Sequence, residues 1–283
     1  MKIASFLLDG QRHVGVLTER GLAVIDTHGA DLGVLLRQGL DLAELRQRAA
    51  ASQRCVDPAN VTFLPPTAEP PKVICVGLNY ADHTKESPYE QPDYPTLFLR
   101  VATSLGAHGA VVERPRVSNS LDWEGEMVVV LGKGGRHIPK EKALDCVFGY
   151  APGNEISVRE YQFKSPQWTV GKNFDGTGTW GPYVVTADEL PPGGKGLRLE
   201  TRLNGEVVQS ADTKDMLFDV ATVISTISEA ITLQAGDIIF SGTPAGVGFG
   251  RSPKRYMKDG DVVEVEIERI GLLRNQIKDE QRG

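Results

Sequence analysis

Residues 121–134, LDWEGEMVVVLGKG, place two acidic side chains, Glu124 and Glu126, directly before an apolar run. Side chains two residues apart on a strand point to the same side of the sheet, so the two carboxylates would face one way. The run 127–131 predicts a strand buried on both faces, with the acidic pair where the strand emerges at the rim of a sheet. Two like charges held so close raise each other's pKa unless a cation neutralises them.

A third acid, Glu155, follows in residues 149–160, GYAPGNEISVRE. Three carboxylates without an obvious Cys or His partner suit a hard cation that prefers oxygen ligands, such as Mg²⁺, Mn²⁺ or Ca²⁺. The alternative is that Glu124 and Glu126 line a solvated strand face, because most acidic residues are exposed. The pattern therefore indicates either a metal site at a strand end or an exposed acidic edge.

The composition is that of an ordinary globular chain, with 283 residues, 40% hydrophobic and 24% charged. This length is enough for one large core or for one large and one small domain. The net charge of −6 and the lack of a long Lys/Arg block argue against a nucleic-acid partner. We therefore expect a small-molecule partner.

The cysteine and hydropathy patterns indicate a reducing, cytoplasmic location. Cys55, Cys75 and Cys146 are odd in number, widely spaced and without a CxxC motif, which argues against a disulfide framework or a zinc site. The apolar run at the N-terminus is too short for a signal peptide, and no later run approaches the length of a membrane span. We therefore expect no membrane association.

A proline-rich segment, LPPTAEPPK at 64–72, predicts a domain boundary, because its four prolines remove backbone donors and favour extended geometry. Before it, residues 5–26 alternate short apolar runs with turn signals, as antiparallel strands do, and residues 32–51 carry a leucine stripe interrupted by a glycine. We predict a small N-terminal α/β domain over residues 1–68 and a catalytic domain over residues 69–283.

The second unit opens with a short buried strand at 73–77, followed by a polar turn and a possible helix. Within that segment His83 and Glu86 lie three residues apart, and on a helix they would share a face and form a candidate acid/base pair. The alternative is a chance pair of surface residues. Residues 95–100, PTLFLR, predict another strand, with Arg100 at its end.

Two glycine-containing loops carry further candidates. Lys172 lies between Gly171 and Asn173, where it could be a partly buried cation that holds a substrate oxygen, or an ordinary exposed lysine. Thr243 lies in a Gly-rich loop after a short strand at 238–240, where N–H groups and the hydroxyl could approach an anion such as a carboxylate. This loop has neither Walker spacing nor the dinucleotide glycine fingerprint, so no nucleotide is predicted.

The remaining patterns predict scaffold. Residues 197–209 predict a hairpin around Asn204-Gly205, and residues 257–271 predict an alternating strand with three glutamates on a solvated face. Residues 212–233 predict the clearest helix of the chain, with Asp212 or Thr213 as its N-cap. Its apolar stripe consists of Leu217, Val220, Ala221, Ile224 and Ile227.

Taken together and in this order, seven motifs closely resemble the fumarylacetoacetate hydrolase superfamily, in its acylpyruvate hydrolase-like branch. They are VGLNYADH, EGE, GNEISVRE, QWTVGKNFDG, LNGE, ITLQAGDIIFSGTPAGVG and the final hairpin. The resemblance covers about residues 70–275. It implies an α+β, mostly β fold, a mixed β-sheet roll with the metal site at its mouth and a small N-terminal α/β domain, usually assembled as a homodimer.

The resemblance also assigns roles. Glu124 and Glu126 match two metal ligands, and Glu155 stands where the family usually has Asp, so its carboxylate must move about 1.5 Å, one C–C bond. His83 and Glu86 match a catalytic pair on a mobile lid. The other matched positions are the active-site lysine Lys172 and the substrate-binding Tyr80, Arg100 (where Lys is common), Arg159, Gln162 and Thr243.

The implied reaction is metal-dependent hydrolysis of a C–C bond in a 1,3-dioxo acid, either an acylpyruvate or a fumarylpyruvate-like compound. The partner is then a small 2-oxo acid. Oxaloacetate decarboxylation and 2-hydroxymuconate-type isomerisation or hydration are alternatives within the family. An alternative from a different functional class is a protein that binds small acids without catalysis, because Glu155 has altered the metal site.

Overall fold

The strand predicted from residues 127–131 lies at the centre of the protein. In this computed structural model, which describes residues 1–281, β11 (Gly125–Leu131) is buried along its whole length. It pairs antiparallel with β12 (Val147–Glu155) on one side and with β18 (Ile238–Phe240) on the other. Such a strand has no solvent-facing side, which explains why its sequence is continuously apolar.

A 13-stranded mixed sheet extends from this centre. Ten strands follow the order β4-β3-β2-β1-β15-β12-β11-β18-β6-β7, while β5 pairs with β1, β14 with β12, and β8 with β14. The β18–β6 and β14–β8 pairs are parallel, and the other pairs of this sheet are antiparallel. Its strands besides those above are β1 (Lys2–Leu8), β2 (Gln11–Thr18), β3 (Gly21–Ile25), β4 (Cys55–Val56), β5 (Thr62–Leu64), β6 (Val73–Gly77), β7 (Thr96–Arg100), β8 (Leu105–Ala107), β14 (Gly178–Trp180) and β15 (Val184–Thr186).

A second, five-stranded sheet packs against β11 and β12, in the order β17-β16-β19-β20-β9. The turn between β16 and β17 has positive φ at both Asn204 (53°) and Gly205 (82°), which confirms the predicted hairpin. The strands are β9 (Val111–Arg114), β16 (Arg198–Leu203), β17 (Glu206–Asp212), β19 (Val262–Ile267) and β20 (Gly271–Asp279), and a separate small pair is formed by β10 (Leu121–Asp122) and β13 (Ser157–Val158).

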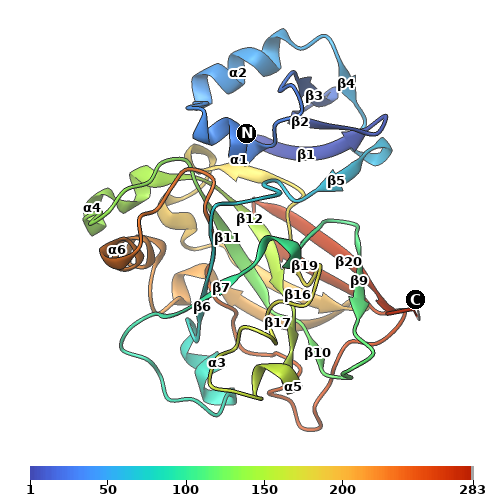
Figure 1. Cartoon of the computed structure of the whole chain (residues 1–283), viewed down its shortest axis with the longest axis vertical. Helices are drawn as coiled ribbons and strands as arrows, with labels where there is room; N and C mark the ends of the chain where they lie inside the picture. The colour runs from blue at the N-terminus through green and yellow to red at the C-terminus, as the bar shows by residue number, and fades with distance from the viewer. Residues whose placement is uncertain (282–283) are drawn as a thin grey trace.

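Short helices fill the connections between strands (Figure 1). The predicted leucine stripe forms two helices because the chain turns at Gly39, where φ is 92°. The α-helices are α1 (Leu32–Arg37), α2 (Leu42–Ala51), α3 (Ala81–Glu86), α4 (Lys140–Ala143), α5 (Arg159–Gln162) and α6 (Val220–Ala230), and the 3₁₀ turns are η1 (Pro58–Asn60), η2 (Ala102–Ser104), η3 (Leu144–Cys146), η4 (Ala187–Glu189), η5 (Pro192–Gly194) and η6 (Thr213–Asp215).

The predicted start of the helix in residues 212–233 is wrong. α6 begins at Val220, and its N-cap is Asp219, which accepts a hydrogen bond from the Thr222 N–H at 2.8 Å. Asp212 instead ends β17, where the hairpin register pairs it with Arg198 on β16. Residues 213–215 form the 3₁₀ turn η6, and the Leu217 N–H donates to the Asn79 carbonyl at 2.8 Å, so Leu217 lies before the helix.

The N-terminal strands continue the main sheet, because β1 pairs with β15. Figure 1 shows these strands, with α1 and α2, together at one end of the molecule, and α3 and α5 at the opposite end. The division predicted at residue 68 falls in the loop between β5 and β6, and it stays a prediction. Within residues 1–281, no helix combines the length and the apolar character that crossing a membrane requires.

We expect Gly125→Ala to destabilise the protein, because a Cβ there would come within 2.1 Å of Thr201 Oγ1 on β16. Overpacking of this kind costs about 1–3 kcal/mol, and urea unfolding measures it. Thr201 Oγ1 has no hydrogen-bond partner among residues 1–281, so Thr201→Ala is a matched control that should recover stability in the double variant. A Gly125→Ala variant as stable as the parent would contradict this packing.

Candidate active site

A small cavity beside α3 gathers most of the predicted site residues. Its volume is ≈ 30 Å³, and the predicted residues on its walls are His83, Glu86, Glu124, Glu126, Arg159, Gln162, Lys172 and Thr243. The other three, Tyr80, Arg100 and Glu155, are buried but do not line it. Residues that lie far apart in the sequence therefore meet here.

Strand pairing brings the three glutamates together. β11 and β12 pair with Gly125 opposite Asn154, which sets Glu155 at the end of β12 beside Glu124 and Glu126. The Glu155 N–H donates to the Glu124 carbonyl at 2.9 Å. One carboxylate oxygen from each of the three buried residues lies within 4.8 Å of the others, so the solvated-edge alternative is wrong.

The acids carry strongly perturbed pKa values. Burial, followed by repulsion from Glu155 and Glu124, raises the pKa of Glu126 well above its usual value. Burial also opposes ionisation of Glu124, but the adjacent Lys172 and Arg159 lower its pKa to about 2. The pKa values of the two neighbouring acids therefore differ because Glu124 forms ion pairs with cations and Glu126 does not.

Three buried cations neutralise most of this charge. Lys172 Nζ lies 2.9 Å from Glu124 Oε2 and 3.0 Å from Glu155 Oε2, so it is not the exposed lysine of the alternative reading. Arg159 Nη1 lies 2.6 Å from Glu124 Oε1, and its Nε donates to Asp122 Oδ2 at 2.8 Å. The third cation, Arg100, has Nη1 3.5 Å from Glu155 Oε1.

These contacts test whether the residues suit a metal ion. Among residues 1–281, Glu126 forms no ion pair, and the buried Glu155 Oε1 has no hydrogen-bond donor. Buried charge and buried acceptors are costly unless they are compensated. A divalent cation bound by Glu124, Glu126 and Glu155 would compensate the charge of Glu126 and give Glu155 Oε1 a partner. Such a cation prefers oxygen ligands of this kind. The donor set therefore fits the predicted metal.

The predicted acid/base pair is formed on α3. His83 Nδ1 lies 2.9 Å from Glu86 Oε1, so the two are not a chance surface pair. Both oxygens of Glu86 accept hydrogen bonds from the Gly246 N–H, each at 3.0 Å. At Gly250 a Cβ would lie 2.7 Å from Glu86 Oε2, so this position leaves room for the carboxylate. His83 is therefore oriented by a carboxylate that is itself fixed by backbone.

The N–H groups of the Gly-rich loop donate to carboxylates of the protein itself, so the predicted contact of this loop with a substrate anion stays a prediction. Besides Glu86, it holds Glu126 through the Gly242 N–H at 2.8 Å. It also holds Asp122 through the N–H groups of Gly248 and Phe249, at 2.7 and 2.9 Å. The loop thus joins the acid/base pair, the acidic triad and the anchor of Arg159.

The predicted substrate-binding residues differ in accessibility. Gln162 lines the cavity and accepts from Arg159 Nη1 at 2.8 Å. Thr243 also lines it, but its hydroxyl donates to the Gly125 carbonyl and accepts from Gln209. Arg100 is turned away from the cavity, because its Nη2 and Nε donate to Thr177 and Ser104.

Tyr80 is enclosed behind the site. Its hydroxyl is buried without a partner among residues 1–281, and burial, then the charge of Glu126, raises its pKa. Sequence reasoning missed Asp122, although it lies in the same LDWEGE motif, and it singled out none of the aromatic walls Trp168, Phe163 and Phe249. Periodicity carries no signal for such contacts.

Comparisons with known proteins extend over nearly the whole chain. The family model described as fumarylacetoacetate (FAA) hydrolase C-terminal matches residues 72–278. The mitochondrial oxaloacetate tautomerase Fahd2a of Rattus norvegicus is 38% identical over 274 residues, covering 94% of this chain and 87% of that protein.

Solved structures agree with this match. The fumarylacetoacetate hydrolase of psychrophilic Exiguobacterium antarcticum superposes with a TM-score of 0.88 at 37% identity, covering 99% of this chain and 100% of that one. A maleylpyruvate hydrolase of Sphingobium sp. SYK-6, solved with manganese(II) and pyruvate, gives a TM-score of 0.82 at 26% identity with the same coverage.

We expect Mn²⁺ affinity to rise with pH, because Glu126 has a raised pKa and must lose its proton before it can bind a metal. Calorimetry in buffers of different ionisation enthalpy should detect proton release on Mn²⁺ binding. Glu126→Gln should weaken binding by more than about tenfold, about 1.4 kcal/mol, and should abolish the proton release.

Glu113→Gln, at an exposed position on β9, is the control and should bind Mn²⁺ like the parent. Mn²⁺ binding that releases no proton, or that survives Glu126→Gln unchanged, would contradict ligation by this carboxylate.

Proposed function

Because the chain belongs to the fumarylacetoacetate hydrolase family, we propose that it is a metal-dependent enzyme that hydrolyses a C–C bond in a 1,3-dioxo acid of the acylpyruvate class. The observation that supports this best is that an oriented acid/base pair, His83 and Glu86, shares one cavity with Glu124 and Glu126. A non-catalytic binder of small acids would need no such pair.

Glu124, Glu126 and Glu155 would hold the metal, for which Mg²⁺ and Mn²⁺ are the first candidates and Ca²⁺ the third. When bound, the ion would act as a Lewis acid toward the 2-oxo acid. The manganese and pyruvate in the structurally similar maleylpyruvate hydrolase support this assignment.

His83 would act as the general base. With its Nδ1–H donated to Glu86, its Nε2 is the nitrogen left to accept a proton from water. The resulting hydroxide adds to the acyl carbonyl, the C–C bond breaks, and the electron pair leaves with the pyruvate enolate. The proton held by His83 then returns to the enolate carbon.

Lys172 would stabilise the negative oxygen that develops during this attack. Burial opposes its charge, but Glu124 and Glu155 raise its pKa overall, so the ammonium group persists at neutral pH. A fixed cation in a site closed to water stabilises a developing oxyanion more strongly than the same cation would in solvent.

Oxaloacetate tautomerisation is the second candidate, because the rat relative of that name matches 94% of this chain. In that reaction His83 would move a proton between the substrate carbon and oxygen, and no water would be consumed. Oxaloacetate decarboxylation and hydroxymuconate-type isomerisation use the same residues. Identification of the products distinguishes hydrolysis, tautomerisation, decarboxylation and isomerisation.

The homodimer and the cytoplasmic location stay predictions. Light scattering of the purified protein tests the assembly, and fractionation of its source cells tests the location.

We expect His83→Gln to lower kcat for acylpyruvate hydrolysis by about 10²–10⁴-fold, because proton transfer loses its base. The assay follows acetylpyruvate and fumarylpyruvate hydrolysis and enol-oxaloacetate conversion in parallel, with Mn²⁺ present. Mn²⁺ affinity should not change, because His83 is not one of the three clustered acids.

His28→Gln, at a fully solvent-facing position, serves as the matched control. Full hydrolytic activity in His83→Gln would rule out this base. Conversion of enol-oxaloacetate without any hydrolysis by the parent protein would replace the first candidate with the second.

A further inference from the structure

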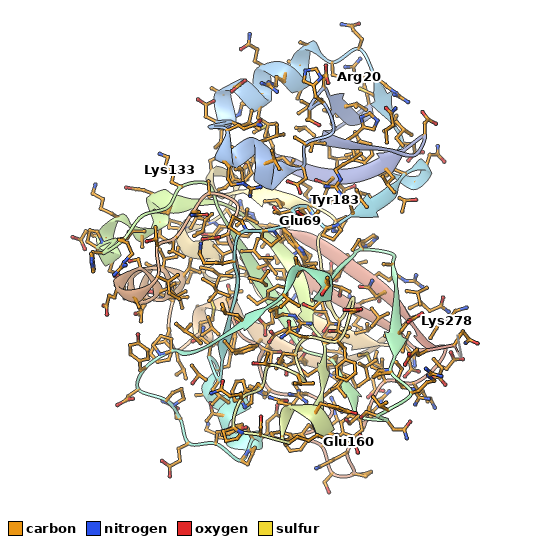
Figure 2. All side chains as sticks on the ribbon, in the orientation of Figure 1. Arg20, Glu69, Lys133, Glu160, Tyr183 and Lys278 are labelled. Atoms are coloured by element: carbon orange, nitrogen blue, oxygen red, sulfur yellow. The ribbon has the colours of Figure 1, made fainter. Side chains whose placement is uncertain are left out.

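Two loops from distant parts of the chain meet beside the catalytic cavity. Residues 87–95 connect α3 to β7 and are called the α3–β7 loop, and residues 163–173 follow α5, carry Lys172 and are called the lysine loop. Figure 1 shows α3 and α5 at the same end of the molecule, and Figure 2 shows Glu160, on α5, at the end opposite Arg20. A contact between the two loops would join the acid/base pair to the cation of the site.

Tyr89 and Trp168 make this contact. The indole Nε1–H of Trp168 donates to the Tyr89 hydroxyl at 3.0 Å, and the two ring centroids lie 5.4 Å apart. Both side chains line the catalytic cavity and are half-buried. The contact therefore forms part of the cavity wall and joins segments 79 residues apart in the sequence.

The six-membered ring of the same indole packs on the main sheet. A Cβ at Gly77, at the end of β6, would lie 2.5 Å from Trp168 Cζ3, so the ring contacts this backbone directly. Phe98 on β7 meets the indole edge to face, with centroids 5.4 Å apart and an interplanar angle of 72°. The sheet supports the ring, and Tyr89 supplies the polar partner of its N–H.

Trp168 is connected to Lys172 through the backbone and through a second ring. The Lys172 N–H donates to the Trp168 carbonyl at 3.2 Å. Lys172 Nζ lies 5.2 Å from the centre of the Phe98 ring, which Trp168 also contacts. The lysine loop is exposed at residues 163–167, so Trp168 is its first half-buried side chain before Lys172.

We propose that Tyr89 and Trp168 are positioning residues that hold Lys172 at a fixed distance from His83. This inference rests on the proposed function, in which His83 activates the water and Lys172 receives the developing negative charge. Tyr89 follows Glu86 by three residues, so its position follows that of α3. Groups that act in one chemical step lose rate when their relative geometry loosens.

Hydrogen exchange tests this without turnover. Tyr89→Phe removes the hydroxyl and keeps the ring, so in the Mn²⁺-loaded protein we expect exchange of the Lys172 amide to accelerate about two- to tenfold, the equilibrium value of one hydrogen bond. Trp168→Phe should in turn accelerate exchange of the Ser87 amide, which donates to the Thr84 carbonyl. In both variants the effect crosses from one loop to the other.

Turnover supplies a readout that a merely structural role would not change. With whichever of acetylpyruvate, fumarylpyruvate or enol-oxaloacetate the parent converts fastest, each single variant should lower kcat about two- to tenfold and leave KM within about twofold, because one hydrogen bond is lost from the positioning contact. The double variant should lose no more than the more impaired single variant, because both substitutions break the same hydrogen bond. Mn²⁺ affinity should not change, since both residues lie outside the three clustered acids.

Tyr94→Phe is the matched control, because Tyr94 lies on the same α3–β7 loop with its side chain 56% exposed. It should exchange and turn over like the parent. Unchanged exchange of the Lys172 amide in Tyr89→Phe, or kcat losses that simply multiply in the double variant, would overturn the inference.

The proposed reaction fails in a different way. If the parent converts none of the three substrates, the proposed function fails, and hydrogen exchange still decides whether the two loops are coupled. Accelerated exchange in both loops of an active protein without any loss of kcat would overturn the positioning role and leave the proposed function in place.

Discussion

The structure depends on the pairing of Lys172 with Glu124 and Glu155 inside the protein. Burying carboxylates is expensive unless each gains a partner, and breaking one such pair leaves an uncompensated charge in the interior. Lys172 comes from the loop after α5, whereas the two acids come from the paired strands β11 and β12. The same contact therefore ties the loop to the sheet and leaves Glu126 as the acid that needs another cation.

The Gly-rich loop after β18 couples the parts of the site. Its N–H groups hold Glu86 beside His83, Glu126 in the acidic triad, and Asp122, which anchors Arg159. A displacement of α3 would break the contacts of Glu86 with the loop and leave the other two intact. Movement of His83 and Glu86 would therefore leave the backbone contacts of Glu126 and Asp122 in place, as the predicted lid requires.

The two residues at which the resemblance led us to expect departures from the family pattern are neighbours in the structure. Arg100 Nη1 lies 3.5 Å from Glu155 Oε1, and both side chains are buried. Gly178 makes room for this arginine, because a Cβ there would lie 2.8 Å from its Nε. Arg100 therefore lies beside one carboxylate oxygen of Glu155, and Lys172 contacts the other oxygen.

The sequence by itself determined the features that depend on neighbours along the chain. Local periodicity and backbone preference determine the buried strand, the glutamates two residues apart, the His83–Glu86 spacing and the Asn204-Gly205 turn. The order of the motifs identified the mostly β roll. Only the tertiary structure decided that α6 begins at Val220, that the Gly-rich loop binds the protein's own carboxylates, and that Arg100 is turned away from the cavity. The last two outcomes depend on contacts between residues far apart in the sequence. Glu126 and Gly242, for example, are 116 residues apart and meet because β11 pairs with β18.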